Sequence, residues 1–460
     1  MAWLVVFALS GPALAGPAAG DGGFFVHETA YDHWGLAEES TQFGLINYND
    51  GYEKLMIAIK VPEADLRQSD RAVWLFPVPA PPEDVSIDLA DRVSEFNGER
   101  LVTLAEKSFR DDILIVVSTQ LYPVVVTVPA YMMPTFGTTG DGQYLLKEGG
   151  GNNTVEVFDS VMEYGVTTEV IAADSSSALY EYMLSLGLEL PSEADPIIED
   201  YLAREYSFVA SWISNMTEFL SEAPLSSMYG GNERFYSFGV GIGFHSDRIF
   251  YPLKLTSVYG EAVVPMLVQV LGFVSPDSFP ERAAVKADFL VDVNADFDSS
   301  MAEFFDAPYP GEHNSVVLED VRYTEIVIDS KASTLTDDLW LDDSPTAAAR
   351  TLDFVASNNW VLSIPLFVVA SMLASLLAGM IVFKGRKPSG WKFAVLGLLN
   401  SSTLLGLWLG SRLLRVDERF VRDRSQPPAP HSVSSFVAMF TLLFLTLVVA
   451  IAGGFFAALA

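Results

Sequence analysis

Three long apolar stretches without a charged residue lie within the last hundred residues, and they constrain the fold more than any other feature. They cover residues 360–383, 393–410 and 435–460. A run of about 20 apolar residues is long enough to cross the hydrocarbon of a bilayer as a helix. Small residues at a spacing of four recur in each stretch and favour close packing of such helices. The sequence therefore predicts three transmembrane helices, with the lipid bilayer as a partner.

Residues 1–15 are expected to form a secretory signal peptide. Ala2 to Leu9 make an apolar core, and Ala13-Leu14-Ala15 supplies the small residues of a cleavage site. No Lys or Arg precedes the core, so an uncleaved anchor is the alternative. A cleaved signal would leave the basic loop Lys384–Lys392 inside, as the positive-inside tendency favours, but the next loop, Arg412–Arg424, has five basic residues and would then lie outside, so the charges do not set the orientation. If the second apolar stretch is instead a re-entrant hairpin, both basic loops lie inside. We therefore expect a multi-pass plasma-membrane protein with a large extracytoplasmic N-terminal domain.

Charge also divides the chain into two environments. Residues 21–358 hold 18 basic against 56 acidic residues and carry a formal charge of −38, whereas residues 359–460 hold 9 basic against 3 acidic and carry +6. A surface this acidic repels phosphate, which argues against nucleic acid as a partner. Divalent cations and basic surfaces of other membrane or envelope proteins suit it, although hydration of the surface is the simpler explanation. The chain has no cysteine, which excludes disulfides and thiolate sites.

The exported part alternates apolar and polar residues like a β-protein and carries one pair of helices near its centre. These patterns predict an α+β, mostly β fold with sandwich-like layers around a central helical hairpin. A stretch rich in glycine and asparagine, Gly149 to Asn153, marks the expected boundary between two lobes. The expected segments are a β-rich lobe at 22–150, an α+β lobe at 151–343 and a juxtamembrane helix at 344–358.

One strand, residues 72–78, runs directly into a group of prolines. Trp74 and Phe76 alternate with Val73 and Leu75, so the strand is expected to pack on both faces. Proline has no N–H to donate, and pairing should therefore end between residues 77 and 79. A polyproline ligand for a groove is the alternative interpretation.

Other local signals mark turns, strands and helix ends. Asn49-Asp50-Gly51 supplies the positive-φ positions of a tight hairpin. Short apolar runs at 112–118 and 251–258 are read as further strands. Gly187 is expected to end the first central helix. The expected N-caps are Asp174 or Ser175 for the first central helix and Ser192 or Asp195 for the second.

Several dispersed segments resemble a known but uncharacterised family. They are "WLFPVPAPPEDV", "YMLSLGLELPSEADPIIEDYLAREYSFVASWI" and "YPLKLTSVYGEAVVPMLVQVLG", together with the hairpin around Gly51. These segments resemble the family catalogued as domain of unknown function 2330, over most of residues 22–275. The resemblance implies no activity, ligand or site residue. Similar proteins often carry cysteines near the start, where this chain has "DGGFF".

A cluster of acidic residues near position 300 has the spacing of a calcium-binding loop. Asp292, Asn294, Asp296 and Asp298 fall at positions 1, 3, 5 and 7 of a twelve-residue loop, with Glu303 at position 12. Position 6 should be glycine but is Phe297. The competing interpretation is a strand whose odd-numbered apolar residues face inward while the acidic residues face solvent. Calcium is therefore a candidate cofactor at this site, and the sequence alone establishes none.

The sequence contains no recognised catalytic motif, and an enzymatic role is the less favoured interpretation. It holds no G-x-S-x-G, Walker or H-E-x-x-H sequence. The expected function is a membrane-anchored cell-surface protein whose acidic domain binds a ligand or envelope component. One alternative is a subunit of a membrane-embedded transport or enzyme complex that uses the polar run Asn400–Thr403. Another is a calcium-dependent surface adhesion module.

Overall fold

The computed structural model describes most of the chain up to residue 358. The described residues are 23–28, 33–36, 42–63, 69–90, 93, 95–121, 155–222, 225–227, 234–276, 285–298, 301–306 and 315–358. The predicted signal peptide, the predicted boundary at Gly149 to Asn153, the polar run Asn400–Thr403 and the three predicted spans all lie outside them. None of the helices within these ranges is long and apolar enough to cross a membrane.

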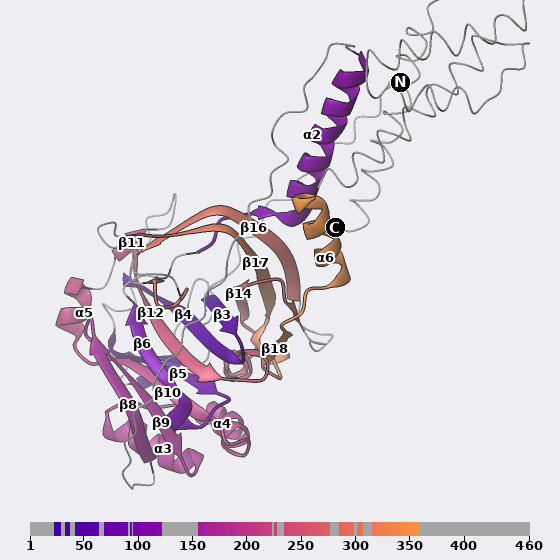
Figure 1. The fold of residues 1–460 in the computed structure, drawn as a ribbon. Coiled ribbons are helices and arrows are strands. Elements are labelled where there is room, and N and C mark those ends of the chain that lie inside the picture. Colours follow the sequence, from indigo (N-terminus) through magenta and orange to yellow (C-terminus); the bar gives the residue numbers. More distant parts are fainter. Residues whose placement is uncertain are drawn as a thin grey trace, which may run out of the picture. The chain divides into compact units, whose positions relative to one another are not determined.

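The chain divides into two compact units, and the first is built mainly of β-sheet. The first unit comprises residues 1–98 and 145–346, and the second comprises residues 99–144 and 347–460. Within the first unit, one antiparallel sheet carries two helices on its outer face and is called here the helix-covered sheet (Figure 1). Its strands, in spatial order, are β2 (His33–Leu36), β1 (Gly23–Glu28), β5 (Ser69–Val78), β10 (Ser207–Ile213), β9 (Val166–Ala173) and β8 (Val155–Glu163).

A second, larger sheet packs against the helix-covered sheet. Its strands run in the order β11 (Leu225–Ser227), β12 (Arg234–His245), β4 (Tyr52–Pro62), β3 (Gln42–Asn49), β14 (Val263–Leu271), β17 (Ser315–Lys331) and β16 (Val285–Asp298), and β6 (Ser86–Ala90) pairs with β12. The pairing of β14 with β3 is parallel. A small third sheet is formed by β13 (Ile249–Tyr251), β18 (Leu339–Asp342) and β15 (Ser275–Pro276).

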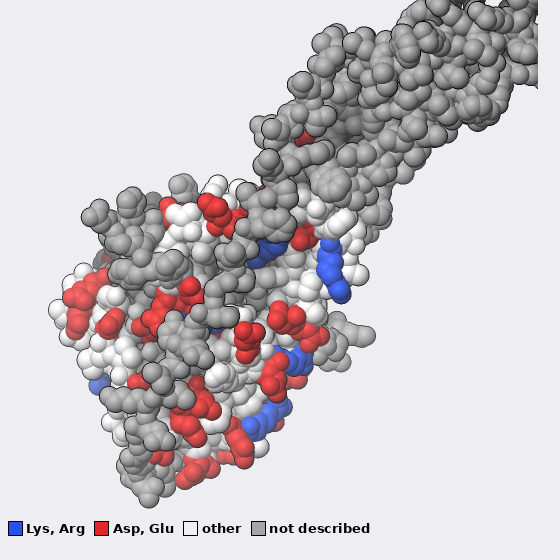
Figure 2. Space-filling view, in the orientation of Figure 1, with Lys and Arg blue, Asp and Glu red and all other residues white. Residues whose placement is uncertain are grey.

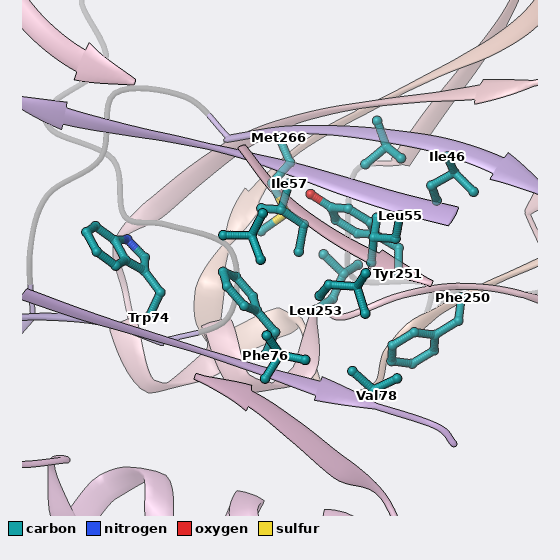
Figure 3. Close-up of a cluster of buried hydrophobic side chains, with 14 of the residues drawn as sticks. Ile46, Leu55, Ile57, Trp74, Phe76, Val78, Phe250, Tyr251, Leu253 and Met266 are labelled. Carbon is teal, nitrogen blue, oxygen red and sulfur yellow. The ribbon is translucent and has the colours of Figure 1, made fainter. Parts of the chain in front are cut away.

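Alternation along β5 explains how the helix-covered sheet is packed on both faces. Trp74 and Phe76 enter the main core between the two large sheets (Figure 3). There the ring of Trp74 meets that of Phe238 edge to face, with centroids 5.2 Å apart. Val73 and Leu75 point to the opposite face and pack with the helices. Pairing with β1 stops at Leu75, and β5 itself ends at Val78, so the prediction that the prolines end this strand is confirmed.

Two short helices, α3 (Ser176–Ser185) and α4 (Asp195–Leu202), cover the outer face of the helix-covered sheet. The Oγ of Ser175 accepts a hydrogen bond from the N–H of Ala178, as predicted for this N-cap. Gly187 follows α3 with φ of 75°, which suits a glycine after a helix end. The expected cap of the second helix is wrong, because α4 begins after Ala194 without a side-chain cap and Ser192 opens a short 3-10 helix, η2 (Ser192–Ala194).

Among the described residues, the outer face of the larger sheet is covered by Phe96 and by the turn at 301–306. Phe96 stacks on Tyr323 with ring centroids 4.9 Å apart and meets the edge of Phe297 at 4.9 Å. The side chain of Gln269, itself buried, accepts from the N–H of Phe96 and donates to its carbonyl. These paired hydrogen bonds hold the chain before residue 98 flat against the sheet.

The predicted strand at 251–258 is wrong beyond Tyr251. The chain there forms the 3-10 helix η3 (Lys254–Tyr259). The carboxylate of Asp338 accepts hydrogen bonds from the N–H groups of Leu253 and Lys254, at 2.9 and 3.0 Å, and so satisfies the first free donors of this helix. The deciding contact comes from a residue more than 80 positions away, and the local apolar pattern carries no sign of it.

The remaining short elements complete the first unit. They are the helix α5 (Met216–Glu222) and the 3-10 helices η1 (Pro82–Asp84) and η5 (Ala332–Thr334).

In the second unit, the described elements are β7 (Glu99–Arg100) and the helices α2 (Leu101–Leu121) and α6 (Ala347–Ser357). The strand predicted at 112–118 is wrong, because these residues continue α2. A short apolar run does not by itself distinguish strand from helix, and here the preceding turns, with Leu101 and Ala105 buried at a helical spacing, set the periodicity. Residues 347–357 of the predicted juxtamembrane segment do form a helix.

The fold is therefore α+β and mostly β, as predicted. Strands from before and after the expected lobe boundary alternate within the same sheets. β5, which precedes the boundary, pairs with β10, which follows it, and β3 likewise pairs with β14. Residues 22–150 and 151–343 share both large sheets rather than forming sequential lobes.

Candidate binding cleft

Two turns that lie side by side form one rim of a cleft in the first unit. The β3–β4 hairpin turns at Asp50 and Gly51, with φ of 50° and 82°, as the sequence predicts. The turn after β12 contributes Ser246 and Asp247. The N–H of Ser246 donates to the carbonyl of Gly51 at 3.0 Å, and the hydroxyl of Tyr48 donates to the carbonyl of Ser246 at 2.9 Å. These bonds hold the two exposed carboxylates, Asp50 and Asp247, on one rim.

Two aromatic side chains, Tyr206 and Trp340, form a wall of the cleft. Tyr206 precedes β10 and Trp340 lies in β18, and both contact the buried ring of Phe250, with centroid distances of 6.1 and 5.0 Å. The guanidinium of Arg248 lies over the Trp340 ring, 5.8 Å from its centroid, and pairs with Asp342 at 3.2 Å. The positive charge of Arg248 is thus already compensated.

The cleft bounded by these groups has a volume of about 780 Å³. It is lined by Asp50 and Gly51, Pro79, Tyr206, residues 245–248 and Trp340. A volume of this size is within the range of small-molecule sites, and a mixed aromatic and polar lining is typical of them.

The electrostatic field near the cleft is negative. Burial, followed by the carboxylates of Asp343, Glu53 and Asp247, raises the pKa of the Tyr48 hydroxyl. Burial and the neighbouring Asp338 raise the pKa of Tyr206 to about 12. Both tyrosines are therefore neutral hydrogen-bonding groups at physiological pH.

The carboxyl group of Glu53, next to the β3–β4 turn in sequence, is buried. Glu53 is fully buried on the core face of β4, opposite Tyr48 and Phe244. Its Oε2 accepts a hydrogen bond from the N–H of Phe250 at 2.8 Å, while Oε1 has no hydrogen-bond partner in the described part of the chain. Desolvation outweighs the single hydrogen bond and raises the pKa of Glu53 well above its usual range.

A second buried carboxyl group, Asp338, ties three elements together beside Tyr206. Besides capping η3, its Oδ1 accepts from the hydroxyl of Tyr201 in α4 at 2.8 Å. Desolvation raises the pKa of Asp338, and burial next to this carboxyl raises that of Tyr201. Asp200 pairs nearby with Lys254 at 2.7 Å and with Arg204 at 2.9 Å. This network is structural, since it joins α4, η3 and the approach to β18.

The residues of the predicted calcium loop are not arranged as a loop. Asp292, Asn294, Asp296 and Asp298 all belong to β16, where they pair with residues of β17. Asp292 accepts hydrogen bonds from the N–H groups of Asn97 and Asn294, both at 3.2 Å. Glu303 follows as an exposed residue in a turn that is otherwise largely buried, and its carbonyl accepts a hydrogen bond from the ammonium of Lys54 at 2.6 Å.

The competing interpretation was a strand with its odd-numbered apolar side chains facing inward. Ala295 and Phe297 are buried, as that interpretation expected. Val293 departs from it, with 54% of its surface exposed. Side chains two apart on an extended strand are about 6.6 Å apart and do not converge on one ion. Within the described ranges, no group of three or more His, Asp or Glu side chains is placed to hold a metal.

Sequence reasoning missed the cleft. The Asn49-Asp50-Gly51 signal marked two of its residues as a turn and the proline group marked Pro79 as a strand end, but neither signal pointed to a cleft. Comparison of the chain with protein-family models, with curated proteins and with solved structures finds no match. The resemblance to domain of unknown function 2330 stays a prediction.

Proposed function

We propose that this chain is a membrane-anchored surface protein whose acidic, β-rich domain binds a small ligand outside the cytoplasm. The observation that carries the proposal is the cleft, which is lined both by the acidic residues of two hydrogen-bonded turns and by the aromatic side chains Tyr206 and Trp340. The predicted signal peptide and the predicted spans at 360–383, 393–410 and 435–460 support the surface location. The absence of a recognised catalytic motif favours binding over catalysis.

The location is tested by adding protease to intact cells that express the full chain. The acidic domain should be cleaved in intact cells, while a cytoplasmic marker protein survives until the cells are permeabilised. N-terminal sequencing of the purified chain then reports whether residues 1–15 are removed. Protection of the domain in intact cells, with loss only after permeabilisation, would refute the location.

The role of the cleft is tested by a photoreactive phenylalanine analogue at position 340. A matched substitution at Leu184, which is 63% exposed on α3, serves as the control. After irradiation of intact cells, mass spectrometry of the purified chain should show a discrete added mass for position 340 and none for position 184. The same adducts at both positions would contradict binding at the cleft.

A further inference from the structure

The charge balance of the cleft identifies the class of ligand. Asp50 and Asp247 are exposed on the rim, and no ion pair joins either of them to a basic side chain within the described ranges. Arg248 does not offset them, because its guanidinium pairs with Asp342 and lies on Trp340. The cleft therefore has a surplus of negative charge.

The aromatic wall suits the same kind of ligand. The half-buried ring of Tyr206 is held by contacts with Tyr201 at 5.4 Å and Phe250 at 6.1 Å, so it is fixed before any ligand arrives. Cations bind favourably over such rings because the aromatic face carries partial negative charge. Cation–π contacts of this kind also occur between side chains of the protein itself. Arg248 lies over the Trp340 ring, and the ammonium of Lys254 lies 5.9 Å from the centroid of the Tyr201 ring.

The charge of the first unit outside the cleft adds to the preference. Acidic side chains dominate the charged residues on the face of the first unit shown in Figure 2. A field of this sign raises the local concentration of cations and speeds their arrival. Anionic ligands would be repelled by the rim and by the wider surface, and a neutral ligand would leave the rim carboxylates uncompensated.

We propose that the cleft binds an organic cation of the alkylammonium type, with the charged group between the Asp50 and Asp247 carboxylates and the ring of Tyr206. This inference rests on the proposed function, because it names the ligand class of the same cleft. A weak, salt-sensitive interaction is expected, since the carboxylates are exposed to solvent.

The test is equilibrium dialysis of labelled choline against the full chain in detergent. Choline should bind saturably, and dimethylbutanol, its uncharged carbon analogue, should not compete. Asp247→Asn and Tyr206→Leu should each weaken binding by roughly 3- to 10-fold, the loss expected for one exposed charge or one cation–π contact. Tyr206→Phe keeps the ring and should bind like the unmodified chain, which separates loss of the contact from loss of folding.

Asp159→Asn provides the matched control, because Asp159 is an exposed acid on the edge strand β8, outside the cleft lining. It should change choline affinity less than twofold. The proposal is overturned if choline does not bind saturably, if dimethylbutanol competes equally, or if Asp159→Asn weakens binding as much as Asp247→Asn. Protease accessibility and the photoadduct at position 340 are measured without choline, so these failures would leave the proposed function standing.

Discussion

Replacing the buried Glu53 by Gln should make the stability of the first unit respond differently to pH. Glu53 is fully buried, and its carboxyl has one hydrogen bond in place of the several that a buried charge needs. Its folded pKa lies well above the reference value of 4.5. Protonation of Glu53 therefore favours the folded state. That contribution is fully present below about pH 4.5 and is lost as the pH rises through the folded pKa.

The size of the effect follows from linkage. Between pH 4.5 and the raised pKa, unfolding releases one additional proton, so the original chain loses about 1.4 kcal/mol relative to Glu53→Gln for each pH unit. The glutamine amide adds N–H groups that need partners, which costs about 1–3 kcal/mol at every pH. The test therefore uses the pH dependence of the difference in unfolding free energy between the variant and the original chain. The constant part of that difference, which the amide also changes, is not used.

The assay is pulse proteolysis of the full chain in urea and detergent across this pH range. The variant-minus-original difference in unfolding free energy should be flat below pH 4.5 and rise steadily above it. Glu222→Gln, at the exposed end of α5, is the matched control and should give a flat difference throughout. A flat difference for Glu53→Gln would show that this carboxyl ionises as freely in the folded as in the unfolded chain, and would refute the argument.

Three further outcomes follow from particular contacts. Gly44→Ala should lower stability by about 1–3 kcal/mol, because the new methyl group would collide with the ring of buried Tyr251; an unchanged midpoint of urea unfolding would contradict this. Tyr201→Phe should cost about 1–2 kcal/mol by removing one of three donors to buried Asp338, and a melting temperature equal to that of the original chain would refute it. Millimolar calcium should leave the melting temperature unchanged, since β16 spreads the acidic residues along a strand; a rise that Asp292→Ala abolishes would restore the calcium loop.

Features decided by neighbouring residues could be predicted from the sequence. The hairpin at Asp50 and Gly51 needs positive φ at both positions, and these residue types tolerate it. Alternation along β5 predicted that Trp74 and Val73 would lie on opposite, packed faces, because a strand has a strict period of two. The Ser175 N-cap could likewise be predicted, because the accepting hydroxyl of Ser175 and the donating N–H of Ala178 lie three residues apart in sequence.

Features decided by distant residues could not be predicted. Local sequence favours a strand after Tyr251, yet Asp338 supplies the cap that makes 254–259 a 3-10 helix. The cleft is lined by segments spread from Asp50 to Trp340, and none of them carries a motif. The order of strands in the sheets also depends on residues that are distant in sequence. Nothing in the sequence of β5 specifies that β10 will be its neighbour.

This order of strands has a consequence for how the protein is made. β17 lies between β14 and β16, so the larger sheet lacks a central strand until synthesis has passed residue 331. β3, near the start, likewise waits for β14, more than 200 residues later, to supply its parallel neighbour. Such long-range pairing makes for slow folding that begins late. The larger sheet therefore stays incomplete until residue 331 has been added, whereas the helix-covered sheet already has all of its strands at Ile213, so the two sheets can form at different stages of synthesis.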